Sequence, residues 1–154
     1  MTTEQNSIPS QNDKVMAALG HISVLLPLIG LMIPIIIWVT QKEKSKYVSF
    51  QGLQAIAYQL VMIFAYFIGM GCYMISFFST FLTLPFAGES SGPSASPMLM
   101  VGFMIPFLAM GAIFIGGAIF ILYGIVAAVM TLQGKDFRYF IIGNRVASFL
   151  DKQN

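Results

Sequence analysis

The sequence predicts an all-α, polytopic membrane protein, and two features of its composition lead to this prediction. Hydrophobic residues make up 57% of the 154 residues, whereas only 9% are charged. A soluble domain carries about 25% charged residues, because it has a large aqueous surface to cover. The charged residues also leave three long uncharged segments, each longer than the roughly 20 apolar residues that cross a bilayer. We therefore expect one helical membrane domain over residues 14–154, with three transmembrane helices.

The first expected crossing is the uncharged segment 15–41, which follows a polar tail, 1–13, that we expect to be disordered. Pro27 and Pro34 lie inside this segment. They should kink the helix or unwind it locally, which membrane helices tolerate where neighbours satisfy the freed carbonyls. The segment is too long for the core of a signal peptide, so we expect no cleavage.

The second and third crossings are expected at about 53–85 and 98–132, on either side of a loop rich in Ser, Pro and Gly. The third segment would form a helix of about 50 Å, which exceeds a hydrocarbon core of about 30 Å. It should therefore tilt, bend near Pro106 or project from the bilayer. A hairpin within it would give four crossings, but its middle lacks polar turn residues, which favours three.

The distribution of Lys and Arg predicts the orientation. Seven of these eight residues lie in the loop 41–50 or in the tail after residue 132, and the loop 88–97 has none. The positive-inside rule places both basic segments in the cytoplasm. With three crossings, we expect a multi-pass protein of the bacterial cytoplasmic membrane whose N-terminus is outside and whose C-terminus is inside.

The C-terminal tail should form a short amphipathic helix over about 142–151. Ile142, Val146, Phe149 and Leu150 recur at helical spacing, with polar residues between them. Such a helix lies in the membrane interface. The alternative is a capping tail that packs on the first loop.

No group of titratable residues predicts an enzyme. The six carboxylates all lie in predicted tails or loops, which excludes an intramembrane carboxylate relay. His21 is the only histidine and has no Cys nearby, so we expect no metal site and no cofactor. It is either a pH-sensitive or ligand-contacting residue or an interfacial ring bonded to a carbonyl or a headgroup. A net charge of +2 provides no basic surface for nucleic acid.

Gln51, Gln54 and Gln59 place a polar stripe at the start of the second crossing. Amides at this depth need partners or water. They either bond across to the first and third helices, which we favour, or line a cavity. Nearby basic residues are candidates for contact with anionic lipid or an acidic partner; they are Lys42, Lys44, Lys46, Arg138 and Arg145.

Small residues four apart on the second and third segments favour close helix contact. The candidate packing positions are Gly69, Gly116, Gly117 and Gly124. They would pack helices within the chain, or join it to a second copy or a larger membrane protein complex.

Three segments resemble a known family: MAALGHIS at 16–23, the Pro- and Trp-containing exit with its Lys-rich turn at 34–60, and GKDFRYFIIGNRV at 134–146. Together they resemble the bacterial Tic-twenty-like membrane family, whose function is unassigned. Its relatives include a chloroplast inner-envelope import subunit and a group in magnetosome membranes that affects crystal size. The resemblance implies a small helical inner-membrane protein, without a known cofactor, that assembles with itself or other proteins.

These observations favour a non-enzymatic accessory or assembly subunit that acts through helix packing and a basic cytoplasmic face. One alternative is an oligomeric transport or protein-translocation component whose inner mouth carries the three glutamines. Another is a self-immunity protein against a membrane-active peptide, a role to which no particular residue points.

Overall fold

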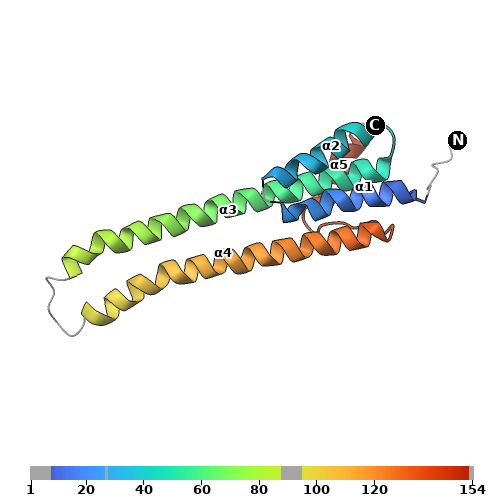
Figure 1. The fold of residues 1–154 in the computed structure, drawn as a ribbon. Coiled ribbons are helices and arrows are strands. Elements are labelled where there is room, and N and C mark those ends of the chain that lie inside the picture. Colours follow the sequence, from blue (N-terminus) through green and yellow to red (C-terminus); the bar gives the residue numbers. More distant parts are fainter. Residues whose placement is uncertain (1–7, 27, 88–94, 153–154) are drawn as a thin grey trace. The chain divides into compact units, whose positions relative to one another are not determined.

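The computed structural model describes residues 8–26, 28–87 and 95–152, and these residues form helices and connecting turns without strands (Figure 1). The all-α class is therefore confirmed. The elements in chain order are α1 (Gln11–Ile22), the 3₁₀ helices η1 (Ser23–Leu25) and η2 (Ile29–Leu31), α2 (Met32–Gln41), α3 (Lys46–Ala87), α4 (Ala95–Leu132) and α5 (Ile142–Asp151).

The chain divides into two compact units. The first comprises Met1–Val61 and Phe120–Asn154, and it contains α1, α2, the beginning of α3, the end of α4 and α5. The second comprises Met62–Ile119, where the remaining parts of α3 and α4 run antiparallel. All eight Lys and Arg residues belong to the first unit, and the second unit is almost entirely uncharged in sequence.

α1 begins at Gln11, four residues before the predicted crossing at 15, and a capping box precedes it. The Ser10 hydroxyl accepts a hydrogen bond from the Asp13 backbone N–H at 3.1 Å. In return, the Asp13 carboxylate accepts one from the Ser10 N–H at 3.0 Å. This reciprocal pair satisfies donors that an uncapped helix start leaves free.

The first apolar segment does not form one continuous helix. α1 ends at Ile22 and α2 begins at Met32. The two helices pack closely, as the surroundings of Gly20 indicate: a Cβ added there would lie only 3.6 Å from Pro34 Cβ. With 12 and 10 residues, they are only about 18 and 15 Å long. Neither length spans a hydrocarbon core of about 30 Å. The structure therefore does not confirm a crossing over 15–41 or a count of three.

The two prolines of this segment have different positions. Pro34 occupies the first turn of α2, where its missing N–H leaves no helical bond unmade. Pro27 lies outside the described residues. Leu28, next to it, has a positive φ of 66°, a conformation that turns the chain between the two short helices and that a non-glycine residue rarely adopts.

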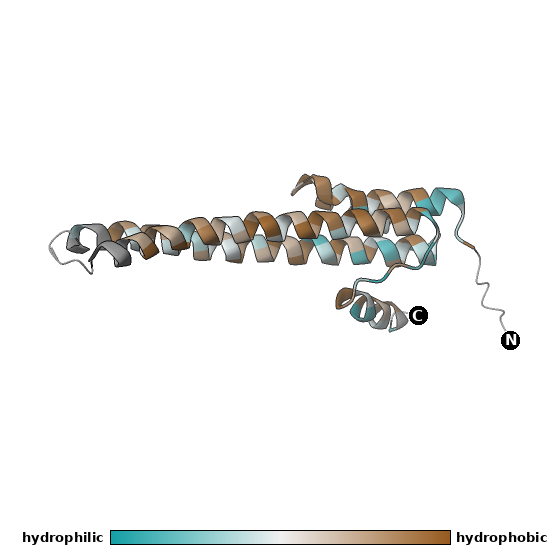
Figure 2. Ribbon diagram, turned by 90° about the horizontal axis from the view of Figure 1, so that it is seen from below, coloured by the Kyte–Doolittle hydropathy of each residue, from teal (hydrophilic) through white to brown (hydrophobic). Residues whose placement is uncertain are grey.

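α3 and α4 are the two long apolar helices of the protein, with 42 and 38 residues. Within the described residues, two stretches are long and apolar enough to cross a membrane: Lys46–Leu82, with mean hydropathy 2.0, and Met100–Leu132, with mean hydropathy 2.5. Figure 2 shows apolar residues along both helices. α3 begins seven residues before the predicted boundary at 53, so the polar stripe belongs to the same helix as the apolar run.

The C-terminal helix α5 has the predicted range, Ile142–Asp151. Val146 on it is buried, whereas Phe149 is exposed. The preceding Phe140 and Ile141 are also exposed, at 89% and 76%. This apolar surface agrees with the expected amphipathic character, and the placement of α5 in a membrane interface stays a prediction.

Candidate functional site

The polar residues that the sequence singles out meet in the first unit. His21 comes from α1, and Gln51, Gln54 and Gln59 come from α3. All four side chains are buried, and those of Gln51 and Gln54 have no exposed surface. We call these four residues, with Tyr139 and Ser23, the polar cluster.

His21 is bonded through both ring nitrogens. Its Nε2 lies 3.2 Å from Gln51 Oε1 and its Nδ1 lies 3.1 Å from the Tyr139 hydroxyl. An amide oxygen only accepts, so Nε2 carries the hydrogen, and the neutral ring accepts the tyrosine hydrogen at Nδ1. Burial lowers the pKa of His21 to about 4, although the bond to Gln51 opposes this shift. The imidazole is therefore neutral near pH 7.

Gln51 and Gln54 hold the segment that connects α4 to α5. The Gln51 amide donates to Phe137 O at 3.1 Å and to Asp136 Oδ1 at 3.3 Å. The Gln54 amide donates to Phe137 O at 3.0 Å, and its oxygen accepts the Tyr139 N–H at 3.1 Å. Residues 135–139 have no helical structure, so these side chains provide partners that regular structure would otherwise provide.

Gln59 bonds to the end of α1. Its amide donates to the Ser23 hydroxyl at 2.8 Å and to Gly20 O at 3.4 Å. The Ser23 hydroxyl itself donates to Gly20 O at 2.7 Å. These bonds satisfy a carbonyl at a helix end, where intrahelical partners are missing.

Aromatic rings close the polar cluster on another side. Tyr58 stacks on Tyr139 with ring centroids 4.1 Å apart, and its hydroxyl donates to Phe120 O at 2.8 Å. Tyr123 and Phe137 meet Tyr139 edge-on at 5.3 and 5.0 Å. Such contacts add to the free energy gained from burying the rings, so the segment after α4 is fixed by both polar and aromatic contacts.

The polar cluster has the chemistry of a structural network. Each glutamine amide in it bonds to protein atoms of α1 or of the segment after α4. Within the described ranges, no group of three His, Cys, Asp or Glu side chains could hold a metal ion. Burial also raises the pKa of the Tyr139 phenol well above its usual value, which keeps this hydroxyl protonated.

Sequence reasoning missed the partners of the glutamines. Phe137 and Tyr139 are both buried, although they lie in a tail with several charges. The available signal was the aromatic alternation in KDFRYF, at 135–140, which is unusual for a solvated tail. The sequence had favoured bonding of the glutamines to the first and third helices. Gln51 and Gln59 do bond to groups of the first segment, and the other partners lie in the segment after α4 and not in the third helix itself.

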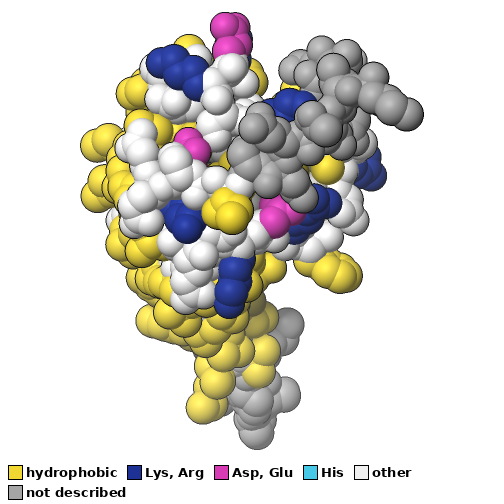
Figure 3. All heavy atoms as spheres, turned by 90° about the vertical axis from the view of Figure 1, so that its right-hand side faces the viewer, with side chains coloured by type: hydrophobic (Ala, Val, Ile, Leu, Met, Phe, Trp, Pro, Cys, Tyr) yellow, Lys and Arg dark blue, Asp and Glu magenta, His cyan; other side chains and the backbone are white. Residues whose placement is uncertain are grey.

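The candidate basic residues are exposed, and some have local partners. Arg138 forms an ion pair with Asp136 at 3.0 Å and lies over the Phe50 ring at 5.2 Å. Lys42 lies over the Trp38 ring at 5.6 Å. Figure 3 shows Lys and Arg side chains among polar atoms on one face. The five candidate residues Lys42, Lys44, Lys46, Arg138 and Arg145 are all exposed, and we call them the basic surface.

The four candidate packing glycines differ in what surrounds them. A Cβ at Gly124 would lie 2.7 Å from Val24 Cγ1, and one at Gly69 would lie 3.2 Å from Ile113 Cγ1. These two glycines therefore pack inside the chain. A Cβ at Gly116 or Gly117 would meet nothing within 4 Å, so these positions have room for a contact from outside.

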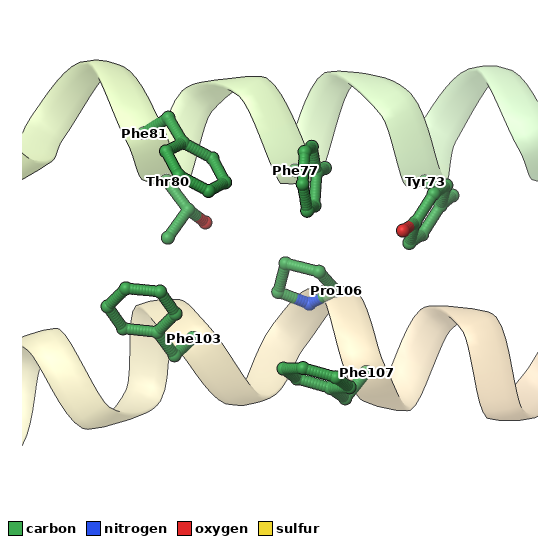
Figure 4. Close-up of a pocket in the computed structure, with 7 residues that line it drawn as sticks. All are labelled: Tyr73, Phe77, Thr80, Phe81, Phe103, Pro106 and Phe107. Atoms are coloured by element: carbon green, nitrogen blue, oxygen red, sulfur yellow. The ribbon is translucent and has the colours of Figure 1, made fainter.

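An aromatic pocket that the sequence analysis did not single out lies in the second unit (Figure 4). It has a volume of about 170 Å³ and is lined by Tyr73, Phe77, Thr80, Phe81, Phe103, Pro106 and Phe107. The signal was the spacing of Tyr73, Phe77 and Phe81, which places three rings on one helix face.

Pro106 does not break α4, because a side chain of α3 bonds to the carbonyl that the proline leaves without its helical partner. Proline has no N–H to donate to the carbonyl four residues earlier, here that of Gly102. The Thr80 hydroxyl from α3 lies 3.0 Å from Gly102 O and 3.0 Å from Ser76 O of its own helix, so its one hydrogen is shared between these two acceptors. A neighbouring helix thus satisfies the freed carbonyl, as apolar surroundings require.

The long apolar helices and the almost uncharged second unit define a small helical membrane protein. The chain matches the family MamF/MmsF, described as the magnetosome magnetite crystal formation protein family, over residues 12–146. It belongs to this family of small magnetosome membrane proteins involved in crystal formation. No curated protein and no solved structure matches the chain.

The family match corrects the resemblance drawn from short motifs. The assignment to a Tic-twenty-like family was wrong, because the family found is MamF/MmsF. The three segments quoted for the resemblance lie inside the matched range, so they are part of the MamF/MmsF pattern. Each motif alone is short, and together they did not separate the two families.

Proposed function

We propose that this protein is a non-enzymatic accessory subunit of crystal formation in the magnetosome membrane. The family match over residues 12–146 is the observation that carries this proposal. The polar cluster supports it, because the buried side chains bond to one another and to the backbone. Such a network stabilises a fold and leaves the protein to act through its surfaces.

The membrane-embedded part of the proposed subunit is α3 with α4. Both helices exceed the length that a bilayer needs, and each contains a continuous apolar stretch. In this arrangement the basic surface lies at the cytoplasmic side. There it is able to meet anionic headgroups or the acidic surface of a partner protein.

Assembly within the membrane would use the open surface of α4. Gly116 and Gly117 leave room for another helix, and the neighbouring Phe114 and Ile115 are 72% and 64% exposed. Small residues let helix backbones approach closely, which favours association in lipid. The partner in this proposal is a second copy or a larger membrane protein.

The buried glutamines provide no support for a transport pathway, because their amides bond to protein groups. We therefore propose no second function. The accessory role and the pathway role also differ in what they require, since only the pathway role needs water beside these amides.

The test of the accessory role combines assembly and crystal growth. The wild-type protein and the double variant Gly116→Leu/Gly117→Leu would be purified in native nanodiscs, and the particle masses compared. The same variants would be expressed in magnetosome-forming cells that lack this gene, and crystal sizes measured. We expect the double variant to lose assembly and to fail to restore crystal size.

Ile115→Leu is the matched control, because it changes an exposed residue of the same surface without adding bulk. It should leave both particle mass and crystal size unchanged. Unchanged assembly in the double variant would contradict this packing surface. Normal crystals in cells without the gene would contradict the role in crystal formation itself.

A further inference from the structure

The hairpin formed by α1 and α2 in the first unit has an apolar, exposed tip. We define the tip as residues 24–29, of which Pro27 is not described. Leu25 and Leu26 are about half exposed, and Leu28 and Ile29 are 65% and 75% exposed. Large apolar side chains gathered at one turn favour contact with lipid or another apolar surface over water.

The opposite end of the hairpin is charged. α1 begins near Asp13 and Lys14, and α2 ends just before Lys42 and Glu43. Between the charged end and the tip, both helices expose apolar side chains outward: Val15, Leu19, Met32, Ile36 and Val39. An element with one charged end and an apolar tip is typical of a hairpin that enters a membrane from one side and returns to the same side.

Contacts within the first unit give the depth of the tip. At the charged end, the Lys14 side chain lies beside Gly134, where an added Cβ would be 2.7 Å from Lys14 Cε. At the tip, Val24 packs against Gly124. The ten residues from Lys14 to Val24 correspond to about 15 Å of helix, half of a hydrocarbon core of about 30 Å.

The break between the helices is suited to an apolar environment. Non-helical backbone is tolerated at membrane depth only where the protein satisfies its polar groups. Gln59 and Ser23 both donate to Gly20 O. The Leu26 N–H donates to Ser23 O at 2.9 Å, and the Gly30 N–H donates to Leu26 O at 2.6 Å. The buried Gln59 thus bonds to the end of α1, directly before the tip.

We propose that the α1–α2 hairpin is a re-entrant element whose tip inserts into the acyl chains of one leaflet, the leaflet on the basic side. Both ends of the chain then lie on that same side of the membrane. The inference rests on the proposed crossing by α3 and α4. It replaces an outside N-terminus by an inside one, and it gathers all eight Lys and Arg residues on one side, as the positive-inside rule favours.

The first test maps the sides of the membrane. In a Cys72→Ser background, which removes the single cysteine, one cysteine would be introduced as Asn12→Cys, Ser96→Cys or Lys152→Cys. A membrane-impermeant maleimide would be added to sealed inner-membrane vesicles of known orientation. We expect Asn12→Cys and Lys152→Cys to be labelled from the cytoplasmic side and Ser96→Cys only from the other side.

The second test measures the depth of the tip in vesicles of phosphatidylcholine and phosphatidylglycerol. A fluorophore on Leu28→Cys should be quenched most strongly by lipids with a nitroxide deep in the acyl chain, and aqueous iodide should leave it unaffected. The matched control is the same fluorophore on Asn12→Cys, which should be quenched by iodide. Ile29→Cys provides a second tip position if the first variant does not fold.

Each other outcome overturns the proposal in a distinguishable way. Labelling of Asn12→Cys and Lys152→Cys from opposite sides would mean that the first segment crosses the membrane. Quenching of the tip by iodide would place it in water, and protection from both quenchers would mean that protein covers it. Labelling of Ser96→Cys from the cytoplasmic side would contradict the proposed crossing by α3 and α4, and it would therefore also contradict the insertion of the hairpin.

Discussion

His21 is held as a neutral ring between Gln51 and Tyr139, and its burial dominates its proton affinity. A buried imidazole that bonds through both nitrogens orients its two partners as long as it stays neutral. Protonation would add a hydrogen at Nδ1, facing the hydrogen of the Tyr139 hydroxyl. The ring therefore joins α1, α3 and the segment after α4 in one protonation state.

This neutral state predicts how stability depends on pH. The pKa of His21 in the folded protein, about 4, lies below the ordinary histidine value of 6.5. The unfolded chain therefore takes up the proton first, and the stabilisation present above pH 6.5 should be lost as pH falls toward 4. The full loss is about 3 kcal/mol, at about 1.4 kcal/mol per pH unit. Thermal unfolding in detergent across this range measures it.

His21→Gln is the control for the pH dependence. It should be less stable than wild type near neutral pH, and its stability should change less across the same range. The carboxylate nearest the cluster, Asp136, bonds to Gln51 and pairs with Arg138. An unaltered pH dependence in His21→Gln would assign the effect to this carboxylate and contradict the assignment to His21.

Gln54 allows a second test at the residue scale. Gln54→Leu should destabilise the protein by about 2 kcal/mol or more, because it leaves Phe137 O with fewer partners and the buried Tyr139 N–H without its acceptor. Gln133→Leu, at an exposed position just after α4, should have little effect. Hydrogen exchange of the Tyr139 N–H should become faster in Gln54→Leu only, and equal exchange in both variants would contradict this role.

At the scale of elements, α4 remains continuous through Pro106 because α3 supplies a hydroxyl. The bond from Thr80 to Gly102 O joins the two helices at the position where proline removes an intrahelical partner. The sequence shows that both Pro106 and Thr80 are present, but it does not show that they act at the same carbonyl. Their pairing depends on the register of two helices whose contact residues lie 22 positions apart.

A double-mutant cycle tests this compensation. Thr80→Val should lower thermal stability by about 1 kcal/mol, since it removes the hydroxyl that bonds to Gly102 O. Pro106→Ala restores an N–H to the same carbonyl, so Thr80→Val should cost less in that background. Ser79→Ala is the control, because Ser79 bonds only to its own helix at Ser76 O. Additive effects of Thr80→Val and Pro106→Ala would contradict the compensation.

At the scale of the whole molecule, the sequence separates a charged part from an almost uncharged part. All Lys and Arg residues belong to the first unit, whereas the second unit exposes large apolar side chains such as Phe107, at 76%, and Ile75, at 73%. A bilayer with an anionic surface provides a favourable environment for both parts, because acyl chains cover the apolar side chains and anionic headgroups contact the basic side chains.

The basic residues should therefore determine which lipids accompany the protein. The triple variant Lys42→Gln/Lys44→Gln/Lys46→Gln should carry less anionic lipid, since each lysine near the surface contributes about 1 kcal/mol. Lipid mass spectrometry of native nanodiscs measures the anionic fraction. Glu43→Gln in the same loop should change it in the opposite direction, and an unchanged fraction in both variants would contradict lipid recognition by this loop.

Composition and periodicity specify the class of this protein and its simplest elements. A low charge content and long apolar runs specify membrane helices, because every backbone polar group in lipid must find a partner within the chain. The recurrence of Ile142, Val146 and Phe149 specified α5 in the same way. These properties depend on composition and on periodicity along one segment, which a sequence shows directly.

The position of the break in the first apolar segment and the pairing of the polar groups depend on contacts between distant parts of the chain. Hydropathy treats 15–41 as one run, whereas contacts of Gly20 with Pro34 and of Ser23 with Gln59 stabilise a hairpin. Likewise, Gly124 packs inside the chain and Gly117 does not, although both have the same residue type and similar neighbours in sequence. These outcomes depend on residues far apart in the chain, and their free energies arise only after the helices have come together.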